Sequence, residues 1–129
     1  MGTSAEEHLT AIVDDDAALR EAIASLLKST GFRTESFASA EDFLRSKRRD
    51  RAGCLIIDGR LPGMDGLELQ QHLVRGGADI PIVFITADED MAGRMQAQAS
   101  QAGAIAFLRK PFSDEDLLHA VRSTRAKHT

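Results

Sequence analysis

Cysteine and the larger aromatic residues are scarce in this chain of 129 residues, which contains one cysteine, no tryptophan and no tyrosine. A lone cysteine cannot form an internal disulfide, and Cys54 lies beside an apolar run, where a small buried hydrophobe is the simplest interpretation. No tyrosine or tryptophan is available to stack on a flavin, and there is no glycine-rich phosphate loop. The sequence therefore argues against a flavin-binding protein.

Long apolar segments and an excess of basic residues are also lacking. No run is long enough to cross a membrane and no charged-then-apolar leader is present, so nothing indicates export or a membrane anchor. We expect a cytoplasmic protein. The 16 lysines and arginines are outnumbered by 20 acidic residues, giving a formal net charge of −4. Direct nucleic-acid binding needs a clustered basic face, so a protein or a small anion is the expected partner.

The chain does contain enough apolar material for one core. Apolar residues make up 43% of the sequence. A chain of this length and composition forms one domain without disulfides to hold it together. We expect a single domain over residues 1–129, folded from about residue 8 to about residue 126, with short flexible termini.

Short apolar runs alternate with segments of helical periodicity. Four runs are too short for a helix and apolar on both faces, as are the strands of a covered parallel sheet. A fifth run, at 33–37, is half polar and suits an edge strand. Together they predict an α/β fold, flavodoxin-like and doubly wound (βα)5, with a five-stranded parallel sheet in the order 2-1-3-4-5. The four apolar runs are 9–13, 54–57, 82–85 and 104–108.

Capping residues mark the expected helix ends. An apolar stripe over 19–27 predicts the first helix, and Gly31 follows where a left-handed cap would close it. Three further helix starts are indicated by a capping oxygen three residues ahead of an acidic residue. The segment 90–103 has few large apolar residues, so we expect a weakly anchored, mobile helix there. The capping pairs are Ser39 with Asp42, Asp65 with Glu68, and Ser113 with Asp116.

Polar functional groups stand at the ends of four apolar runs. The carboxyl ends of neighbouring parallel strands meet in one crevice, so these groups are expected to converge. Each alone has an ordinary alternative role: an aspartate as a helix cap, a threonine as a local hydrogen-bonding group, a lysine as a solvated charge. Their shared position favours a site for a divalent cation and a phosphoryl group. The residues are Asp14 and Asp15, Asp58, Thr86 and Lys110.

Four sequence blocks carry a family resemblance. They are IVDDD at 12–16, IDGRLPGMDG at 57–66, ITA at 85–87 and FLRKPF at 107–112. On these blocks the chain resembles the receiver domain of two-component response regulators. The residues at 39–44 and 61–70 are similar to those of the FixJ-like subgroup, whose members usually continue into a helix-turn-helix DNA-binding domain.

The resemblance implies a role for each residue that would meet phosphate. Asp58 would accept the phosphoryl group, and Lys110 would bind one of its oxygens. The hydroxyl of Thr86 and the amide of Ala87 would bind another. Thr86 and Phe107 would also act as switch residues, the first moving toward the phosphate and the second rotating inward. The bond that precedes Pro111 would be cis, as it is in the family.

The resemblance also implies Mg²⁺ as the cofactor. Asp15, Asp58 and the backbone carbonyl of Arg60 would be direct ligands, and Asp14 would act through a bound water. Without the metal, three crowded carboxylates repel one another, which should raise at least one of their pKa values. Mg²⁺ is therefore expected to stabilise the fold.

The implied function is that of a signalling phosphoacceptor and not of an enzyme, beyond its own phosphorylation and slow autodephosphorylation. The phosphoryl group would come from the phosphohistidine of a sensor histidine kinase. It would switch the face made by the fourth helix, fifth strand and fifth helix, and so control homodimerisation and a downstream transcriptional output domain. We also hypothesise that Arg60 and Asp88 pair across the site and set the lifetime of the phosphate.

Other functions are weighed against this one. A stand-alone single-domain response regulator is the first alternative. An inert pseudo-receiver is the second, although such a module usually lacks a key residue and here all are present. An aspartyl phosphatase would need a second catalytic acid just after Asp58, where Arg60 stands.

Overall fold

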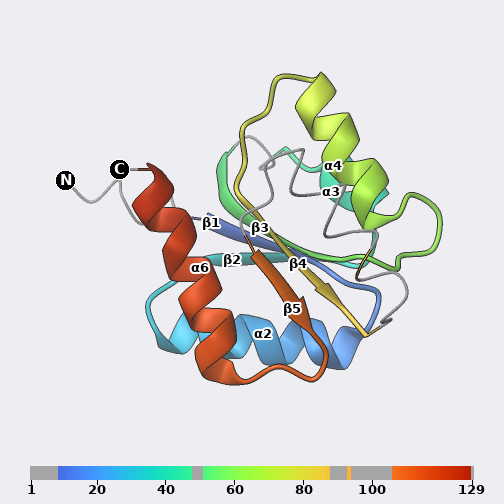
Figure 1. The fold of residues 1–129 in the computed structure, drawn as a ribbon. Helices are drawn as coiled ribbons and strands as arrows, with labels where there is room; N and C mark the ends of the chain where they lie inside the picture. The colour runs from blue at the N-terminus through green and yellow to red at the C-terminus, as the bar shows by residue number, and fades with distance from the viewer. Residues whose placement is uncertain (1–8, 48–50, 88–92, 94–105, 129) are drawn as a thin grey trace.

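The structure is a computed structural model that describes residues 9–47, 51–87, 93 and 106–128. In this part of the chain, five parallel strands form one sheet in the order β2-β1-β3-β4-β5 (Figure 1). The predicted α/β fold class and its flavodoxin-like strand order are confirmed. The strands are β1 (Leu9–Val13), β2 (Thr34–Phe37), β3 (Ala52–Asp58), β4 (Ile82–Thr86) and β5 (Ala106–Arg109).

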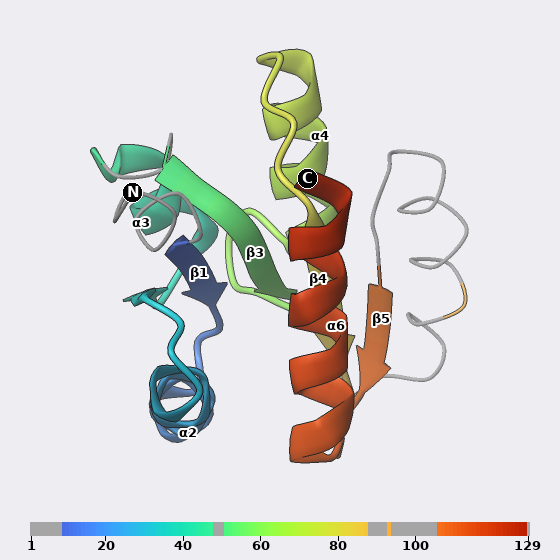
Figure 2. The ribbon, with the colours of Figure 1, turned by 90° about the vertical axis from the view of Figure 1, so that its left-hand side faces the viewer.

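Helices cover both faces of the sheet (Figures 1 and 2). They are α2 (Ala17–Ser29), α3 (Ala40–Arg45), α4 (Gly66–Arg75) and α6 (Asp114–His128). Successive strand residues point to opposite faces. In β3, Leu55 and Ile57 pack with α3 and α4, while Cys54 and Ile56 pack with α2 and α6. Because both faces are covered, this strand is apolar as far as Ile57 and shows no alternation in the sequence.

Burial along the strands matches their position in the sheet. Every residue of β1 and of β4 is buried, whereas β2, at one edge, is only partly buried. The half-polar fifth run is therefore an edge strand, as predicted. Cys54 is a buried free cysteine, and burial raises the pKa of its thiol to about 12, as expected for a structural residue.

The first helix ends as its sequence predicts. Gly31 has a φ of +93°, the left-handed conformation that favours glycine. Its N–H donates to the carbonyl of Lys28, and the N–H of Phe32 donates to the carbonyl of Leu27. This pair of bonds is the Schellman motif, which satisfies the last carbonyls of α2.

The three predicted helix starts are also present. The side chains of Ser39 and Ser113 each accept a hydrogen bond from the backbone N–H three residues further on. Asp65 and Glu68 form a complete capping box at the start of α4. The expected mobile helix at 90–103 falls outside the described residues, apart from Gly93. Among the helices that the structure describes, none is long and apolar enough to cross a membrane.

Candidate functional site

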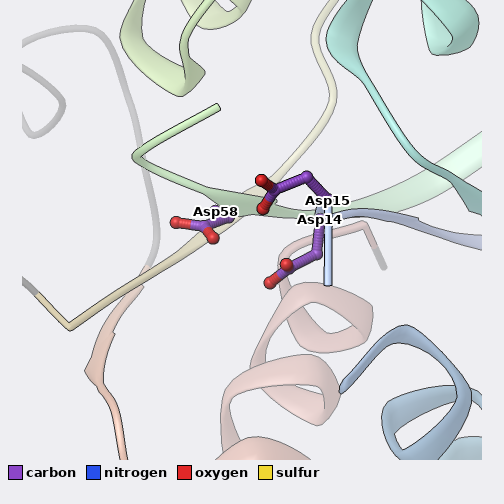
Figure 3. A group of neighbouring side chains, drawn as sticks. All are labelled: Asp14, Asp15 and Asp58. Carbon is purple, nitrogen blue, oxygen red and sulfur yellow. The ribbon is translucent and has the colours of Figure 1, made fainter. Parts of the chain in front are cut away.

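Three carboxylates meet at the carboxyl end of the sheet. Asp14 and Asp15 directly follow β1, and Asp58 is the last residue of β3. Because β1 and β3 are neighbours, the three side chains come together (Figure 3). One oxygen of each carboxylate lies within 4.8 Å of the others. The convergence predicted from the sequence is therefore present.

Backbone hydrogen bonds hold the ends of β3, β4 and β5 together. The N–H of Gly59 donates to the carbonyl of Ile85 at 2.9 Å, and the N–H of Lys110 donates to the carbonyl of Thr86 at 2.8 Å. Each bond continues the pairing of parallel strands by one residue. Asp58, Thr86 and Lys110 are thus carried on one connected backbone.

Asp14 is the most deeply buried of the three carboxylates. Its side chain is inaccessible to solvent, and its Oδ1 accepts a hydrogen bond from the N–H of Asp16 at 2.8 Å. The pKa of Asp14 is raised, mainly by burial and further by the charge of Asp58. The hydrogen bond from Asp16 and the charge of Lys110 lower the pKa but do not outweigh these two causes. The predicted repulsion between carboxylates is present, but loss of hydration contributes more to the pKa than repulsion does.

Lys110 brings a positive charge to the three carboxylates. Its Nζ lies 3.0 Å from Oδ2 of Asp58 and 3.3 Å from Oδ2 of Asp14. Burial alone lowers the pKa of the ammonium, but the hydrogen bond and charge of Asp58, followed by those of Asp14, outweigh burial and raise the pKa. Lys110 is therefore a cation at neutral pH that bridges two of the three carboxylates.

The carboxylate of Asp58 is held at both oxygens. Oδ1 accepts the N–H of Arg60 at 2.9 Å, and Oδ2 accepts the ammonium of Lys110. Beside it opens a hollow of about 320 Å³ lined by Asp58, Arg60, Ala87 and Lys110. An anion in this hollow would meet the ammonium and the carboxylate at the same time.

The expected switch residues lie on neighbouring strands. Thr86 ends β4 and is 2% exposed. Phe107, on β5, is partly buried and stacks on Phe84, with ring centroids 5.5 Å apart and planes at 16°. The bond between Lys110 and Pro111 is cis, as expected.

Two residues that shape the turn after β1 are missed by sequence reasoning. The side chain of Asp16 accepts from the N–H groups of Ala18 and Leu19, at 3.0 and 3.2 Å, and so caps α2. Its position just ahead of the apolar stripe is a signal that predicts such a cap. Arg20 donates from Nη1 to the carbonyl of Asp14 at 2.7 Å. No sequence pattern indicates that contact, because it depends on how the turn folds back on the helix.

Comparison with known proteins decides the family. The response regulator receiver domain model matches residues 10–122. The chain belongs to this family. The match includes every predicted site residue and all five strands apart from Leu9 at the start of β1, so the resemblance inferred from four short blocks is confirmed.

Relatives of this receiver domain confirm the FixJ-like subgroup. Response regulator protein TmoT of Ectopseudomonas mendocina is 46% identical over 118 residues, which cover 92% of this chain and 53% of TmoT. A solved structure of the response regulator StyR has a TM-score of 0.83 and 46% identity, over 91% of this chain and 59% of the StyR chain. The structure of FixJ-N has a TM-score of 0.80 and 35% identity, over 91% of this chain and 92% of its own. The receiver domain spans about half the length of the curated relatives it matches.

The donor set of the receiver site fits Mg²⁺. Carboxylate oxygens are the hard ligands that this ion prefers, and opposite ligands around it stand about 4.2 Å apart. The oxygens of Asp14, Asp15 and Asp58 lie within 4.8 Å of one another, close to that span. Two of the three carboxylates share the ammonium of Lys110. A divalent cation would add positive charge beside all three.

Proposed function

We propose that this receiver domain takes a phosphoryl group onto Asp58 from the phosphohistidine of a sensor kinase. The observation that carries the proposal is the setting of Asp58. Its carboxylate lines the hollow, lies close to those of the acidic pair after β1 and contacts the ammonium of Lys110. Phosphoryl transfer requires that the accepting carboxylate is positioned and that the negative charge at the site is neutralised. The hydrogen bonds from the Arg60 N–H and from Lys110 provide the positioning.

In the proposed transfer, a carboxylate oxygen of Asp58 bonds to phosphorus while the phosphorus–nitrogen bond of the donor histidine breaks. The electron pair of that bond stays on the imidazole nitrogen. The ammonium of Lys110, already on Asp58, is close enough to bind a phosphoryl oxygen. The hydroxyl of Thr86 and the amide of Ala87 are the proposed donors to a second phosphoryl oxygen, since Thr86 ends β4 and Ala87 lines the hollow.

We further propose that Asp15, Asp58 and the backbone carbonyl of Arg60 hold Mg²⁺ directly. When bound, the ion neutralises charge on the carboxylates and on the phosphoryl oxygens. Asp15 suits direct ligation because it is exposed at the turn. The side chain of Asp14 is inaccessible to solvent, and an indirect role through a bound water is proposed for it.

The proposed chemistry is that of a phosphoacceptor, limited to its own phosphorylation and slow autodephosphorylation. Arg60 lines the hollow, and its side chain is proposed to restrict the access of water to the phosphoryl group. Asp88, its expected partner, lies outside the described residues. Arg60→Ala is expected to change the dephosphorylation rate, and an unchanged rate would remove this role.

A second hollow, of about 490 Å³, adjoins the site between α2 and α6 and shares Ala87 and Lys110 with it. Its walls are mainly apolar side chains of α2 and of the turn that precedes α6, and α6 itself contributes Asp114 and Leu117. A sensor kinase must bring its histidine to Asp58, so this groove is the proposed kinase docking surface. Ala22→Asp is expected to slow transfer from a kinase but not from acetyl phosphate. Equal slowing with both donors would contradict the assignment.

Phosphorylation is proposed to act on the face made by β5, α6 and the helix expected between β4 and β5, most of which lies outside the described residues. The switch would be movement of Thr86 toward phosphate and of Phe107 inward. The proposed output is homodimerisation that controls a transcriptional domain, as the name and greater length of the transcriptional regulatory protein FixJ of Azorhizobium caulinodans suggest. Sedimentation with and without beryllofluoride and Mg²⁺ tests dimerisation, and identical profiles would argue against it.

The acceptor itself is tested by intact mass after incubation with acetyl phosphate, with and without Mg²⁺, in parallel with Asp58→Asn. A gain of one phosphoryl group that needs both Mg²⁺ and Asp58 is the expected result. No gain by folded protein, with a donor that phosphorylates another receiver, would favour an inert interaction module.

A further inference from the structure

The loop that follows Asp58 is tied to the start of α3 by one carboxylate. Residues 59–65 connect β3 to α4. Glu41, in the first turn of α3, accepts a hydrogen bond on Oε2 from the N–H of Met64 at 3.0 Å. The two residues are 23 positions apart, so the bond joins two separate elements of the fold.

Gly63 leaves the space that this bond requires. Its φ of +74° is the left-handed conformation that side chains rarely adopt. A Cβ atom at this position would stand 2.6 Å from Oε2 of Glu41. The carboxylate therefore occupies the place where any other side chain would begin.

The contact between Glu41 and the loop is charge-assisted. The N–H of Met64 is the main cause that lowers the pKa of Glu41, and the N–H of Glu41 itself adds to it. The carboxyl group is thus ionised at neutral pH. Hydrogen bonds from an N–H to a carboxylate are shorter and stronger than those to a neutral acceptor.

The two ends of the loop are fixed independently of Glu41. The N–H of Gly59 bonds to β4, and the N–H of Gly66 donates to the carbonyl of Gly59 at 3.3 Å. Asp65 is held in the capping box of α4. Glu41 acts between these anchors, on the stretch that follows Arg60.

We propose that Glu41 is a positioning residue, which holds Met64 so that the loop presents the carbonyl of Arg60 to Mg²⁺. A ligand that is already ordered costs less to bind than one that must be ordered on binding. Loss of the Glu41 contact therefore weakens metal binding without removing any ligand. This inference rests on the proposed function, because it assumes that the carbonyl of Arg60 is a metal ligand.

The test compares Glu41→Ala and Glu41→Gln with Asp42→Asn as the matched control. Asp42 lies in the same helical turn and carries the same charge, but its carboxylate pairs with Arg45 and not with the loop. Mg²⁺ alone is titrated by calorimetry, and exchange of the Met64 amide is followed by NMR. We expect Glu41→Ala to weaken Mg²⁺ binding about three- to tenfold, the value of one net hydrogen bond, and to speed exchange at Met64.

The conservative variant separates positioning from folding. Glu41→Gln keeps an acceptor oxygen and is expected to recover part of the Mg²⁺ affinity, and Asp42→Asn to match wild type. Gly63→Ala is expected to weaken Mg²⁺ binding too, but by less when Glu41 is already alanine, because the clash is then gone. Strictly additive losses would overturn the link between the two residues.

Failure of this role and failure of the metal site give different results. Wild-type protein that binds no Mg²⁺ would overturn the proposed metal site. Wild-type protein that binds Mg²⁺, with the same affinity in Glu41→Ala, would overturn only the role of Glu41. A loss of thermal stability in Glu41→Ala with unchanged Mg²⁺ affinity would show a purely structural residue and overturn it as well.

Discussion

At the scale of single residues, Lys110 sets the charge balance of the site. Its ammonium contacts the carboxylates of both Asp14 and Asp58, and its side chain is 23% exposed. Lys110→Met leaves two buried carboxylates facing each other, so we expect the free energy of unfolding without metal to fall by about 1–3 kcal/mol. Urea unfolding followed by far-UV circular dichroism measures it. Lys110→Arg, which keeps the charge, is the control, and unchanged stability of Lys110→Met would contradict the prediction.

The lowered pKa of Glu41 predicts a pH-dependent contribution to stability. A carboxyl group whose pKa is lower in the folded state adds stability above its ordinary value, here 4.5, and loses it as the pH falls through the folded value. The difference in free energy of unfolding between wild type and Glu41→Gln should therefore be present at neutral pH and vanish in acid. An equal difference at neutral and at acid pH would show that the charge of Glu41 does not contribute to stability.

Individual site residues were predictable where a strand carries them. Asp14, Asp58 and Lys110 stand at strand ends, and parallel strands bring those ends together whatever the loops do. Arg20 and Glu41 were not, because each contact joins a side chain to the backbone of a turn whose shape the local sequence does not specify.

At the scale of elements, the end of α4 offers a matched pair of glycines. Gly76 has a φ of −80°, which alanine adopts freely, while Gly77 has a φ of +80°. Neither position would crowd a Cβ, since nothing lies within 4 Å at Gly77 and the nearest atom at Gly76 is 3.5 Å away. Gly77→Ala should cost about 1–2 kcal/mol of stability, and Gly76→Ala should be neutral or slightly stabilising. Equal costs in urea unfolding would contradict this account.

Element types followed from the sequence more reliably than element bounds. Strands covered on both faces are apolar throughout, and capping side chains mark helix starts, so both signals are local. The last strand was expected at 104–108 but is described at Ala106–Arg109. Arg109 belongs to this strand because its backbone pairs with that of Thr86. Hydropathy gives no sign of such backbone pairing at a charged residue.

At the scale of the whole molecule, the proposed metal site predicts that Mg²⁺ binding and folding are linked. Asp14, Asp15 and Asp58 come together only in the folded chain, so Mg²⁺ should raise the free energy of unfolding by about 2.7 kcal/mol at a hundredfold excess over its Kd. Asp14→Asn removes a buried charge and its repulsion with Asp58, so without metal this variant should be at least as stable as wild type. Its free energy of unfolding should rise less than that of wild type when Mg²⁺ is added. Wild-type stability that does not respond to Mg²⁺ would contradict the linkage.

Two expectations about the whole chain stay predictions. A single receiver domain over residues 1–129, folded from about residue 8 to about residue 126, predicts one cooperative unfolding transition. The two apolar clusters share the same central strands, so neither is expected to unfold alone. The cytoplasmic location is the other prediction, and cell fractionation tests it.

The most direct measurement locates the phosphoryl group after reaction with acetyl phosphate and Mg²⁺. Borohydride reduces an aspartyl phosphate to homoserine, whose position peptide mass spectrometry determines. We expect homoserine in place of Asp58 alone, and only when both the donor and Mg²⁺ were present. Homoserine in place of Asp14 or Asp15 instead, or its absence from protein that carries the phosphoryl group, would contradict Asp58 as the acceptor.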